Sequence, residues 1–406
     1  MKHFCFPVFN RATYGRVREV IKAIHAHEQL SVEVVISSHF NDDLAKEDYV
    51  TYELQGIPIH HLIVDTSDKS HAGSIKVTHQ IIEAFSHYLK GKTFDGIIVF
   101  GDRFETLAPA IVSGYMNIPL IHISGGEVTG NIDERVRHAV TKLADYHFVG
   151  TRLAKKYLIQ MGEDPVRVVY AGCPSIDLAR NNFIKRYRST EKYFICQFHP
   201  HTTESALAAK QTTVLAEAII EYATKSGVHC YWYWPNPDPG REEVIAILEA
   251  AHRENKLFLI KAKNKPPEDF LYQLAGAKFI IGNSSAVIRE SNYLGVPSIN
   301  VGHRQSIRER GINVMDCEFD KDSLVKTMNI QDEQKKYPSH FLFGDGRASR
   351  IIASYLDKLD LSLKGPLTYP AWIQFREDHF GRSRFANHRK NRGNADYPAK
   401  AKNKAS

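Results

Sequence analysis

The chain has 406 residues, of which 43% are hydrophobic and 24% charged, and its formal net charge is +7. This length exceeds what one hydrophobic core usually holds, so two domains are expected in a globular protein. No apolar run approaches the roughly 18 residues of a membrane span, and the apolar start of the chain is short and lacks a small-residue cleavage site. Neither a membrane span nor a signal peptide is therefore expected.

The positive charge is concentrated at the end of the chain. Residues 376–406 hold nine Lys/Arg and three Asp/Glu, a balance of +6, so the remainder is close to neutral. This segment has few apolar residues, and we predict a basic, flexible tail and no nucleic-acid partner. Contact of the tail with RNA or an acidic membrane is the alternative. The five cysteines are scattered without a C-x-x-C pair, which favours buried thiols in a cytoplasmic protein.

Short apolar runs alternate with amphipathic segments along the first half, a pattern typical of a parallel sheet covered by helices. The expected strands are Lys2–Phe9, Val32–Ser37, Ile59–Val64, Gly96–Phe100, Pro119–Ile123, Tyr146–Val149 and Val166–Tyr170. The expected helices are Tyr14–Glu28, Ser74–Lys90, Glu105–Met116, Glu134–Ala144 and Arg152–Met161.

A polar, basic stretch at residues 179–192 separates the halves, and the pattern then restarts. The second set of strands is Tyr193–Phe198, Val228–Trp234, Leu257–Ile260, Ala277–Ile281 and Pro297–Val301. The second set of helices is Glu204–Ser226, Arg241–Glu254, Glu268–Ala275 and Ala286–Leu294.

These elements predict an α/β protein with two Rossmann-like domains facing one cleft. The N-terminal domain is expected over residues 1–180 and the C-terminal domain over 190–347, followed by the tail at 376–406. A helix is expected at Ala348–Leu359, within segment 348–375. Whether this helix crosses back to the first domain is not decided by the sequence alone. Neither half carries a G-x-G-x-x-G or Walker-type loop, so a nicotinamide or ATP site has little support.

Candidate catalytic groups follow two consecutive strands of the first half. Asp102, Arg103 and Glu105 follow the run GIIVF, and Glu127 follows the run PLIHIS behind a Gly-Gly pair. Ligands of open α/β sheets bind at the carboxyl ends of the strands, so these two corners indicate one shared site. The protein is expected to be an enzyme.

A second group of polar residues follows strands of the second half. The turn GNSS offers Ser284, Ser285 and unpaired backbone N–H groups at a helix start, either as an anion site or as a simple helix cap. Glu290 lies about a turn and a half into that helix, where it would accept hydrogen bonds from ribose hydroxyls. Arg304 follows the next strand, and Arg11 follows the first strand of the chain. Arginines and helix N-termini hold a diphosphate without a metal.

An imidazole completes the set. His199 ends the first strand of the second half, and the unperturbed pKa of histidine suits proton transfer near neutrality. Most of the 20 histidines are expected to be surface or structural residues, and those without a contextual signal include His25, His27, His60, His61 and His87.

The quoted motifs resemble those of the hydrolysing UDP-N-acetylglucosamine 2-epimerases of sialic-acid biosynthesis. The resemblance runs in consistent order from about Phe4 to Val314. It is carried by RATYG, GDRFETLA, HISGGEVTGNID, RHAVTKLADYHF, FHPHTTE, PNPDPG, IIGNSSAVIRE and GHRQSIRERGINV. It implies two domains of the GT-B type, a homodimer or homotetramer, a UDP-sugar in the cleft, and neither a metal nor a cofactor.

The resemblance also implies roles for individual residues. Asp102, Glu127, Asp133 and Glu134 would supply the acid–base groups, with His199 near the diphosphate. The nucleotide would be held by Arg11, Ser284, Ser285, Glu290 and Arg304. In the family, C2 loses a proton while UDP leaves C1, and water adds to the resulting 2-acetamidoglucal to give free N-acetylmannosamine. Which carboxylate is base and which is acid stays open, and His138 is a weaker candidate.

Departures from the family pattern affect the choice of substrate. Thr13 and Gly15 replace an Asp and a Ser that are frequent in the first loop, and segment 65–75 matches less clearly. A hydrolysing epimerase of a UDP-2,4-diacetamido-trideoxyhexose, of legionaminic-acid pathways, is therefore the first alternative. A non-hydrolysing 2-epimerase follows, although GNSS stands where that branch is expected to have a motif such as DSGG. A GT-B glycosyltransferase and a non-catalytic UDP-sugar-binding protein have no use for the carboxylate pair.

Overall fold

The computed structural model describes most of the chain. The described residues are 1–37, 50, 53–68, 70–130, 132–183, 191–201, 206–236, 240–255, 258–262, 265–305 and 307–364, and the side chains of residues 11–12 and 181–183 are not described. The predicted basic tail at 376–406 lies outside these residues. Of the helices in the described ranges, none is long and apolar enough to cross a membrane.

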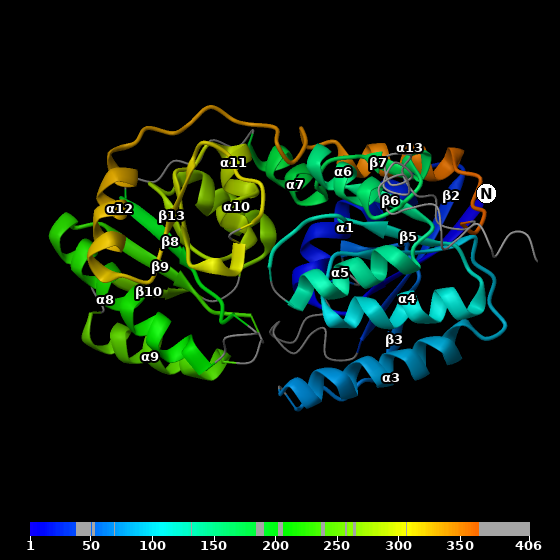
Figure 1. Ribbon diagram of the computed structural model, residues 1–406, viewed down its shortest axis with the longest axis horizontal. Coiled ribbons are helices and arrows are strands. Elements are labelled where there is room, and N and C mark those ends of the chain that lie inside the picture. The colour runs from blue at the N-terminus through cyan, green and yellow to red at the C-terminus, as the bar shows by residue number, and fades with distance from the viewer. Residues whose placement is uncertain are drawn as a thin grey trace, which may run out of the picture.

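Two parallel sheets form the centre of the protein, side by side in Figure 1. The first sheet has the order β3-β2-β1-β4-β5-β6-β7 and the second the order β10-β9-β8-β11-β12-β13. The first-sheet strands are β1 (Lys2–Val8), β2 (Leu30–Ser37), β3 (Ile59–Leu62), β4 (Gly96–Phe100), β5 (Leu120–Ile123), β6 (Tyr146–Val149) and β7 (Val168–Tyr170). The second-sheet strands are β8 (Tyr193–Gln197), β9 (His229–Tyr233), β10 (Leu259–Ala262), β11 (Ile280–Gly282), β12 (Ser298–Val301) and β13 (Val314–Cys317). The predicted pair of Rossmann-like sheets is thus confirmed.

The strands form where apolar runs are short and continuous. Every residue of β4 and β5 is buried, as expected for parallel strands that are covered by helices on both faces. The helices around the first sheet are α1 (Arg11–His25), α3 (His71–Leu89), α4 (Phe104–Met116), α5 (Ile132–Leu143), α6 (Arg152–Gln160) and α7 (Pro174–Phe183). Those that follow are α8 (Ala208–Ser226), α9 (Arg241–Glu254), α10 (Pro267–Gly276), α11 (Glu290–Leu294), α12 (Lys321–Glu333) and α13 (Ala348–Lys358).

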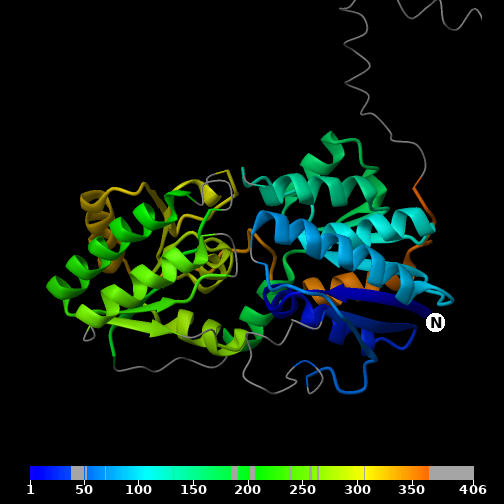
Figure 2. The same ribbon diagram turned by 90° about the horizontal axis from the view of Figure 1, so that it is seen from below.

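Each sheet has a hydrophobic core on both faces. On one face of the first sheet, α3 and α4 pack over residues such as Val99 and Leu120, and they lie side by side in Figure 2. On the other face, α1 and α13 pack over residues such as Phe6 and Ile98. The second sheet has a corresponding pair of cores, one of which also contains Ile176 of α7. Helix α7 therefore joins the two lobes.

The last helix returns to the first lobe. Figure 1 shows the chain crossing from α12 to α13, and Ile352, Ala353 and Leu356 are buried in the first-lobe core. Asp177 of α7 accepts hydrogen bonds from the backbone N–H groups of Ala348 and Ser349 (2.9 and 2.6 Å), which fixes the start of α13. We propose that the first domain comprises residues 1–180 and the segment returning at 348; the boundaries at 180, 190 and 347 stay predictions.

Helix α13 is expected to be an integral part of the first lobe. Replacing Ile352 (0% exposed) by alanine leaves a cavity in the first-lobe core, and should lower the free energy of unfolding by about 2–5 kcal/mol. Urea denaturation measures the change, and Lys358→Ala at the exposed end of the same helix serves as the control. Equal stability of Ile352→Ala and the wild type would mean that α13 is not needed for the core.

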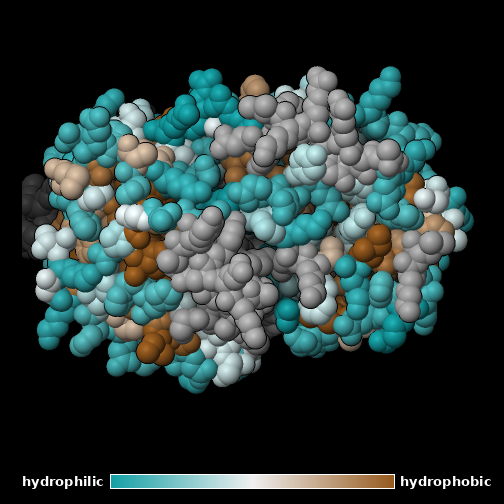
Figure 3. All heavy atoms as spheres, turned by 180° about the vertical axis from the view of Figure 1, so that it is seen from behind, coloured by the Kyte–Doolittle hydropathy of each residue, from teal (hydrophilic) through white to brown (hydrophobic). Residues whose placement is uncertain are grey.

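Among the described residues on the face seen in Figure 3, hydrophobic residues occur as separate patches between hydrophilic ones. All five cysteines are free and buried, as predicted for thiols.

Candidate active site

The first carboxylate, Asp102, is positioned by a buried histidine. His122 of β5 is fully buried, with Nε2 2.9 Å from the carbonyl oxygen of Gly101 and Nδ1 3.2 Å from Oγ1 of Thr141. Burial lowers the pKa of His122 to about 3, so the ring is neutral. Its role is structural, through hydrogen bonds to both ring nitrogens. It fixes the turn after β4, from which Asp102 extends.

Asp102 pairs with a buried arginine. The guanidinium of Arg137, on α5, contacts the Asp102 carboxylate, the carbonyl oxygen of Glu127 and, at 3.5 Å, Oγ1 of Thr129. Burial by itself raises the pKa of Asp102, but Arg137 and more distant arginines outweigh it and hold this pKa well below its ordinary value. Asp102 is therefore ionised, and Arg137 ties the corners after β4 and β5 together.

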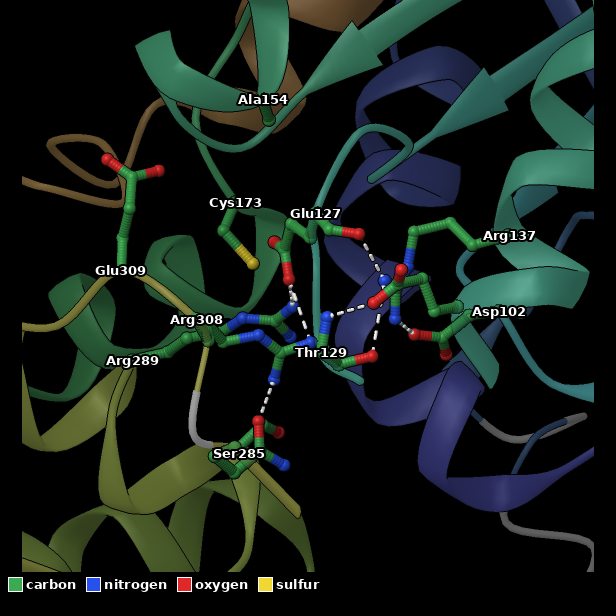
Figure 4. A network of polar contacts seen from close by, with 12 residues as sticks. Asp102, Glu127, Thr129, Arg137, Ala154, Cys173, Ser285, Arg289, Arg308 and Glu309 are labelled. Atoms are coloured by element: carbon green, nitrogen blue, oxygen red, sulfur yellow. Dashed lines mark hydrogen bonds and ion pairs between the residues drawn. The ribbon is translucent and has the colours of Figure 1, made fainter. Parts of the chain in front are cut away.

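The second carboxylate, Glu127, is turned into the space between the lobes. Ser124 and Gly126 have φ values of +67° and +80°, and a Cβ at Gly126 would lie 2.5 Å from the carbonyl oxygen of Ala154, so only glycine fits. Oε2 of Glu127 accepts from Nη2 of Arg289 (2.5 Å) and lies 2.8 Å from Nη2 of Arg308, both from the second lobe (Figure 4). Burial raises the pKa of Glu127, but Arg289, Arg308 and Arg137 outweigh this and lower it to about 2.

The two arginines are incompletely paired. Oε1 of Glu127, Nε and Nη1 of Arg289 and Nε of Arg308 are buried without a hydrogen-bond partner among the described residues. Burial lowers the pKa of Arg308 to about 9 despite the attraction of Glu127, so it remains a cation at neutral pH. Unpaired N–H groups of buried cations are costly unless a ligand satisfies them.

Arginines of both lobes gather at this junction. Arg16 of α1 donates from Nη2 to Oγ of Ser285 (2.8 Å), and burial and Arg289 lower its pKa. Four arginines, at positions 16, 137, 289 and 308, therefore lie around Asp102 and Glu127. Such a cluster suits an anionic ligand with several oxygens.

Glu134 has a different position from these two carboxylates. Its Oε2 accepts from the backbone N–H groups of Thr129 and Gly130, both at 2.6 Å, and these contacts lower its pKa against the effect of burial. It thus holds the loop between Glu127 and α5. Asp133 is half-buried in the first turn of α5, and His138 lies 3.8 Å from Glu134.

His199 is fixed at the end of β8. The side chain of Asn283 bonds both the N–H and the carbonyl oxygen of His199 (2.8 Å each), and Nδ1 of His199 accepts from the backbone N–H of Asn236 at 3.1 Å. With Nδ1 as acceptor, the proton of the neutral ring is on Nε2. The buried imidazole, 4% exposed, is therefore a hydrogen-bond donor.

The turn after β11 differs from the sequence prediction. The expected helix at Ala286–Leu294 is a 3-10 turn, η4 (Ser285–Val287), followed by the short helix α11, so Glu290 is the first residue of α11. The expected position of Glu290 inside a continuous helix was therefore wrong. Ile288 and Arg289 keep right-handed helical backbone angles between the two pieces, and the N–H groups of both bond the carbonyl oxygen of Ser285 (3.1 and 2.9 Å).

The remaining predicted ligands lie near this turn. Ser284 accepts from the backbone N–H of Ala286 (3.4 Å), and Arg304 donates to the carbonyl oxygen of Asn283 (3.1 Å). Glu290 is 8% exposed, and its Oε2 has no hydrogen-bond partner among the described residues. The side chain of Arg11 lies outside the described ones, although its backbone begins α1. Within the described part of the chain, no three His, Cys, Asp or Glu residues gather as a metal site.

Sequence reasoning missed most of the arginine cluster. Arg289 and Arg308 lie in the quoted motifs IIGNSSAVIRE and GHRQSIRERGINV, and Arg16 directly follows RATYG. The only sign of these arginines in the sequence was their position in or next to the quoted motifs. A sequence does not reveal that an arginine is buried against a carboxylate of another domain.

Comparison with known proteins places these observations in a family. The family model described as UDP-N-acetylglucosamine 2-epimerase matches residues 22–357. A hydrolysing UDP-N,N'-diacetylbacillosamine 2-epimerase of Legionella pneumophila is 30% identical over 86% of this chain and 94% of its own. A UDP-N-acetylglucosamine 2-epimerase of Neisseria meningitidis is 27% identical over 86% of this chain and 93% of its own. The structure of the Methanocaldococcus jannaschii UDP-GlcNAc 2-epimerase in complex with UDP-GlcNAc and UDP has the same fold (TM-score 0.73, 18% identity, 88% of this chain and 100% of that one).

Proposed function

Because the chain belongs to the UDP-N-acetylglucosamine 2-epimerase family of enzymes, we propose that it is a hydrolysing UDP-sugar 2-epimerase that converts UDP-N-acetylglucosamine and water to N-acetylmannosamine and UDP. The observation that carries this proposal is the junction at Glu127. There an ionised carboxylate meets arginines with unpaired N–H groups from the opposite lobe. A base beside a cradle for phosphate is what elimination of UDP requires.

The proposed reaction has two stages. A carboxylate takes the proton from C2, the C2–H electrons form the C1=C2 double bond, and the C1–O bond breaks so that UDP leaves with the bonding pair. Water then adds its hydroxyl to C1, and a proton is delivered to the opposite face of C2. We assign the base to Glu127, whose Oε1 lacks a partner, and the acid–base partner to Asp102.

The nucleotide is proposed to lie along the second lobe. Ser284, Ser285, Glu290 and Arg304 surround the turn after β11, and the Nε2–H of His199 is suited to donate to a phosphate oxygen. We retain Arg11 as a proposed ligand, and Asp133 and Glu134 as proposed members of the acid–base set. Within that set, Glu134 acts through the loop that carries Glu127.

A second candidate substrate is favoured by one comparison. The 30% identical relative is a hydrolysing UDP-N,N'-diacetylbacillosamine 2-epimerase, so that UDP-diacetamido sugar is the alternative to UDP-N-acetylglucosamine. Both substrates would share the diphosphate and the C2 acetamido group, and therefore the same base and arginines.

Incubation of the protein with each UDP-sugar in deuterated water, followed by NMR, tests the function. We expect UDP and the free 2-epimer carrying deuterium at C2, because the proton delivered to the opposite face of C2 comes from a group that has exchanged with the solvent. Product from the diacetamido substrate alone would select the second candidate. A UDP-linked epimer would indicate the reversible branch, and the absence of reaction with both sugars would refute the proposal.

A further inference from the structure

One carboxylate holds two arginines of the opposite lobe. Oε2 of Glu127 lies 2.5 Å from Nη2 of Arg289 and 2.8 Å from Nη2 of Arg308, and all three side chains are less than a tenth exposed. These ion pairs connect the first lobe to the second directly. They are made by the same residue that we assign as the base.

Arg289 and Arg308 have more N–H donors than the carboxylate of Glu127 accepts from. A guanidinium has five N–H donors, and Nε and Nη1 of Arg289 and Nε of Arg308 are buried without a partner in the described residues. Arg289 and Arg308 also repel each other, which contributes to the lowered pKa of Arg308. A second anion between them would satisfy both the donors and the charge.

Glu127 in this state is a weak base. The two guanidiniums stabilise its ionised form, and its pKa of about 2 is far from the pH at which a general base is most effective. Removal of a proton from C2 therefore requires that the arginines be drawn away from this carboxylate. The diphosphate of the substrate is a multivalent anion with the bidentate geometry that guanidinium prefers.

We propose that Arg289 and Arg308 are shared between Glu127 and the diphosphate of the bound nucleotide, and that they pass from the carboxylate to the phosphate oxygens when the substrate enters. The inference rests on the proposed function and adds to it a reason why the base acts only when the nucleotide is in place. Arg289 and Arg308 are positioning residues with respect to Glu127.

Competition between carboxylate and phosphate is measurable without turnover. Replacing Glu127 by glutamine releases both arginines, so UDP and inorganic pyrophosphate should each bind about fivefold or more tightly than to the wild type, by isothermal titration calorimetry. Uridine, which has no phosphate, should show unchanged affinity. Glu309→Gln is the matched control: this carboxylate is in the same loop as Arg308, accepts from Oγ1 of Thr151, and points away from the arginines in Figure 4.

Unchanged or weaker binding of UDP and pyrophosphate by folded Glu127→Gln would overturn the proposal that Arg289 and Arg308 are shared between Glu127 and the diphosphate. Because this result does not depend on turnover, a wild type that hydrolyses a UDP-sugar would keep the proposed function in that case. Conversely, tighter binding by the variant together with no turnover of any UDP-sugar by the wild type would refute the function alone.

A second variant tests the same idea if Glu127→Gln fails to fold. Arg308→Gln removes one of the cations that face Glu127. The other charged or titratable groups around Glu127 are Arg289, Arg137, Cys173 and Glu309. The pKa of Glu127 in the free enzyme should then rise, and the acid limb of kcat/KM should move to higher pH. A purely structural role of Arg308 would lower the rate without moving the limb, and that outcome would overturn the proposal.

Discussion

Replacing Glu127 by glutamine is expected to lower kcat by roughly a thousandfold, because the amide keeps the size of the side chain but cannot accept the C2 proton. Glu127 is 5% exposed, and water is a far weaker base than the carboxylate that it would have to replace. The release of UDP from UDP-N-acetylglucosamine, followed by NMR, measures the loss.

The control for this experiment separates catalysis from folding. Glu309→Gln removes a carboxylate from the same junction and should retain activity, since Glu309 bonds Thr151 rather than an arginine. Far-UV circular dichroism and UDP binding report whether Glu127→Gln is folded. Activity of the folded variant within tenfold of the wild type would exclude Glu127 as the base.

Replacing Arg137 by methionine should lower the free energy of unfolding by about 3–5 kcal/mol, the usual cost of removing one partner of a buried ion pair. Arg137 is 1% exposed, and its loss leaves Asp102 and the carbonyl oxygen of Glu127 without their donor. Urea denaturation measures the effect. Arg135→Met, an exposed position on the same helix, should change stability by less than about 0.5 kcal/mol.

The pH dependence of stability gives an independent check on the same pair. The pKa of Asp102 is lower in the folded protein than its ordinary value of 3.8, because Arg137 outweighs the effect of burial. Its contribution is therefore fully present above the unfolded pKa and is lost as the pH falls through the folded pKa. Arg137→Met should lose less stability than the wild type on acidification below about pH 4. Identical acid dependence in both proteins would show that the pair does not stabilise the fold.

Most of the fold could be predicted from local pattern. Each strand of the first sheet and each of the first five of the second was expected within a few residues of its position, and most of them are short buried apolar runs; β3 (IHHL), with two exposed histidines, is an exception. The segments that were missed are α7, β13 and α12. Pro174–Phe183 is rich in polar residues and β13 is only four residues long, so neither has a clear periodicity, and their burial depends on neighbours from the other lobe or the sheet edge.

The candidate site could be predicted only in part. Asp102 and Glu127 follow apolar runs directly, so their place at strand ends is a local property. Arg289 is 162 residues from Glu127 along the chain, and its motif indicates a turn but no partner. The resemblance assigns Glu134 to the acid–base set together with Asp102 and Glu127. In the structure its carboxylate accepts a hydrogen bond from the backbone of its own loop.

The sequence by itself determined the two parallel sheets, the family and the strand ends that carry the carboxylates, because hydrophobic periodicity and motif order are local along the chain. Only the tertiary structure decided the ionisation and partners of those carboxylates. Burial and the approach of guanidiniums from the opposite lobe set the pKa of Glu127, and both depend on how the two lobes meet. The electrostatics of the site is thus a property of the assembled pair of lobes.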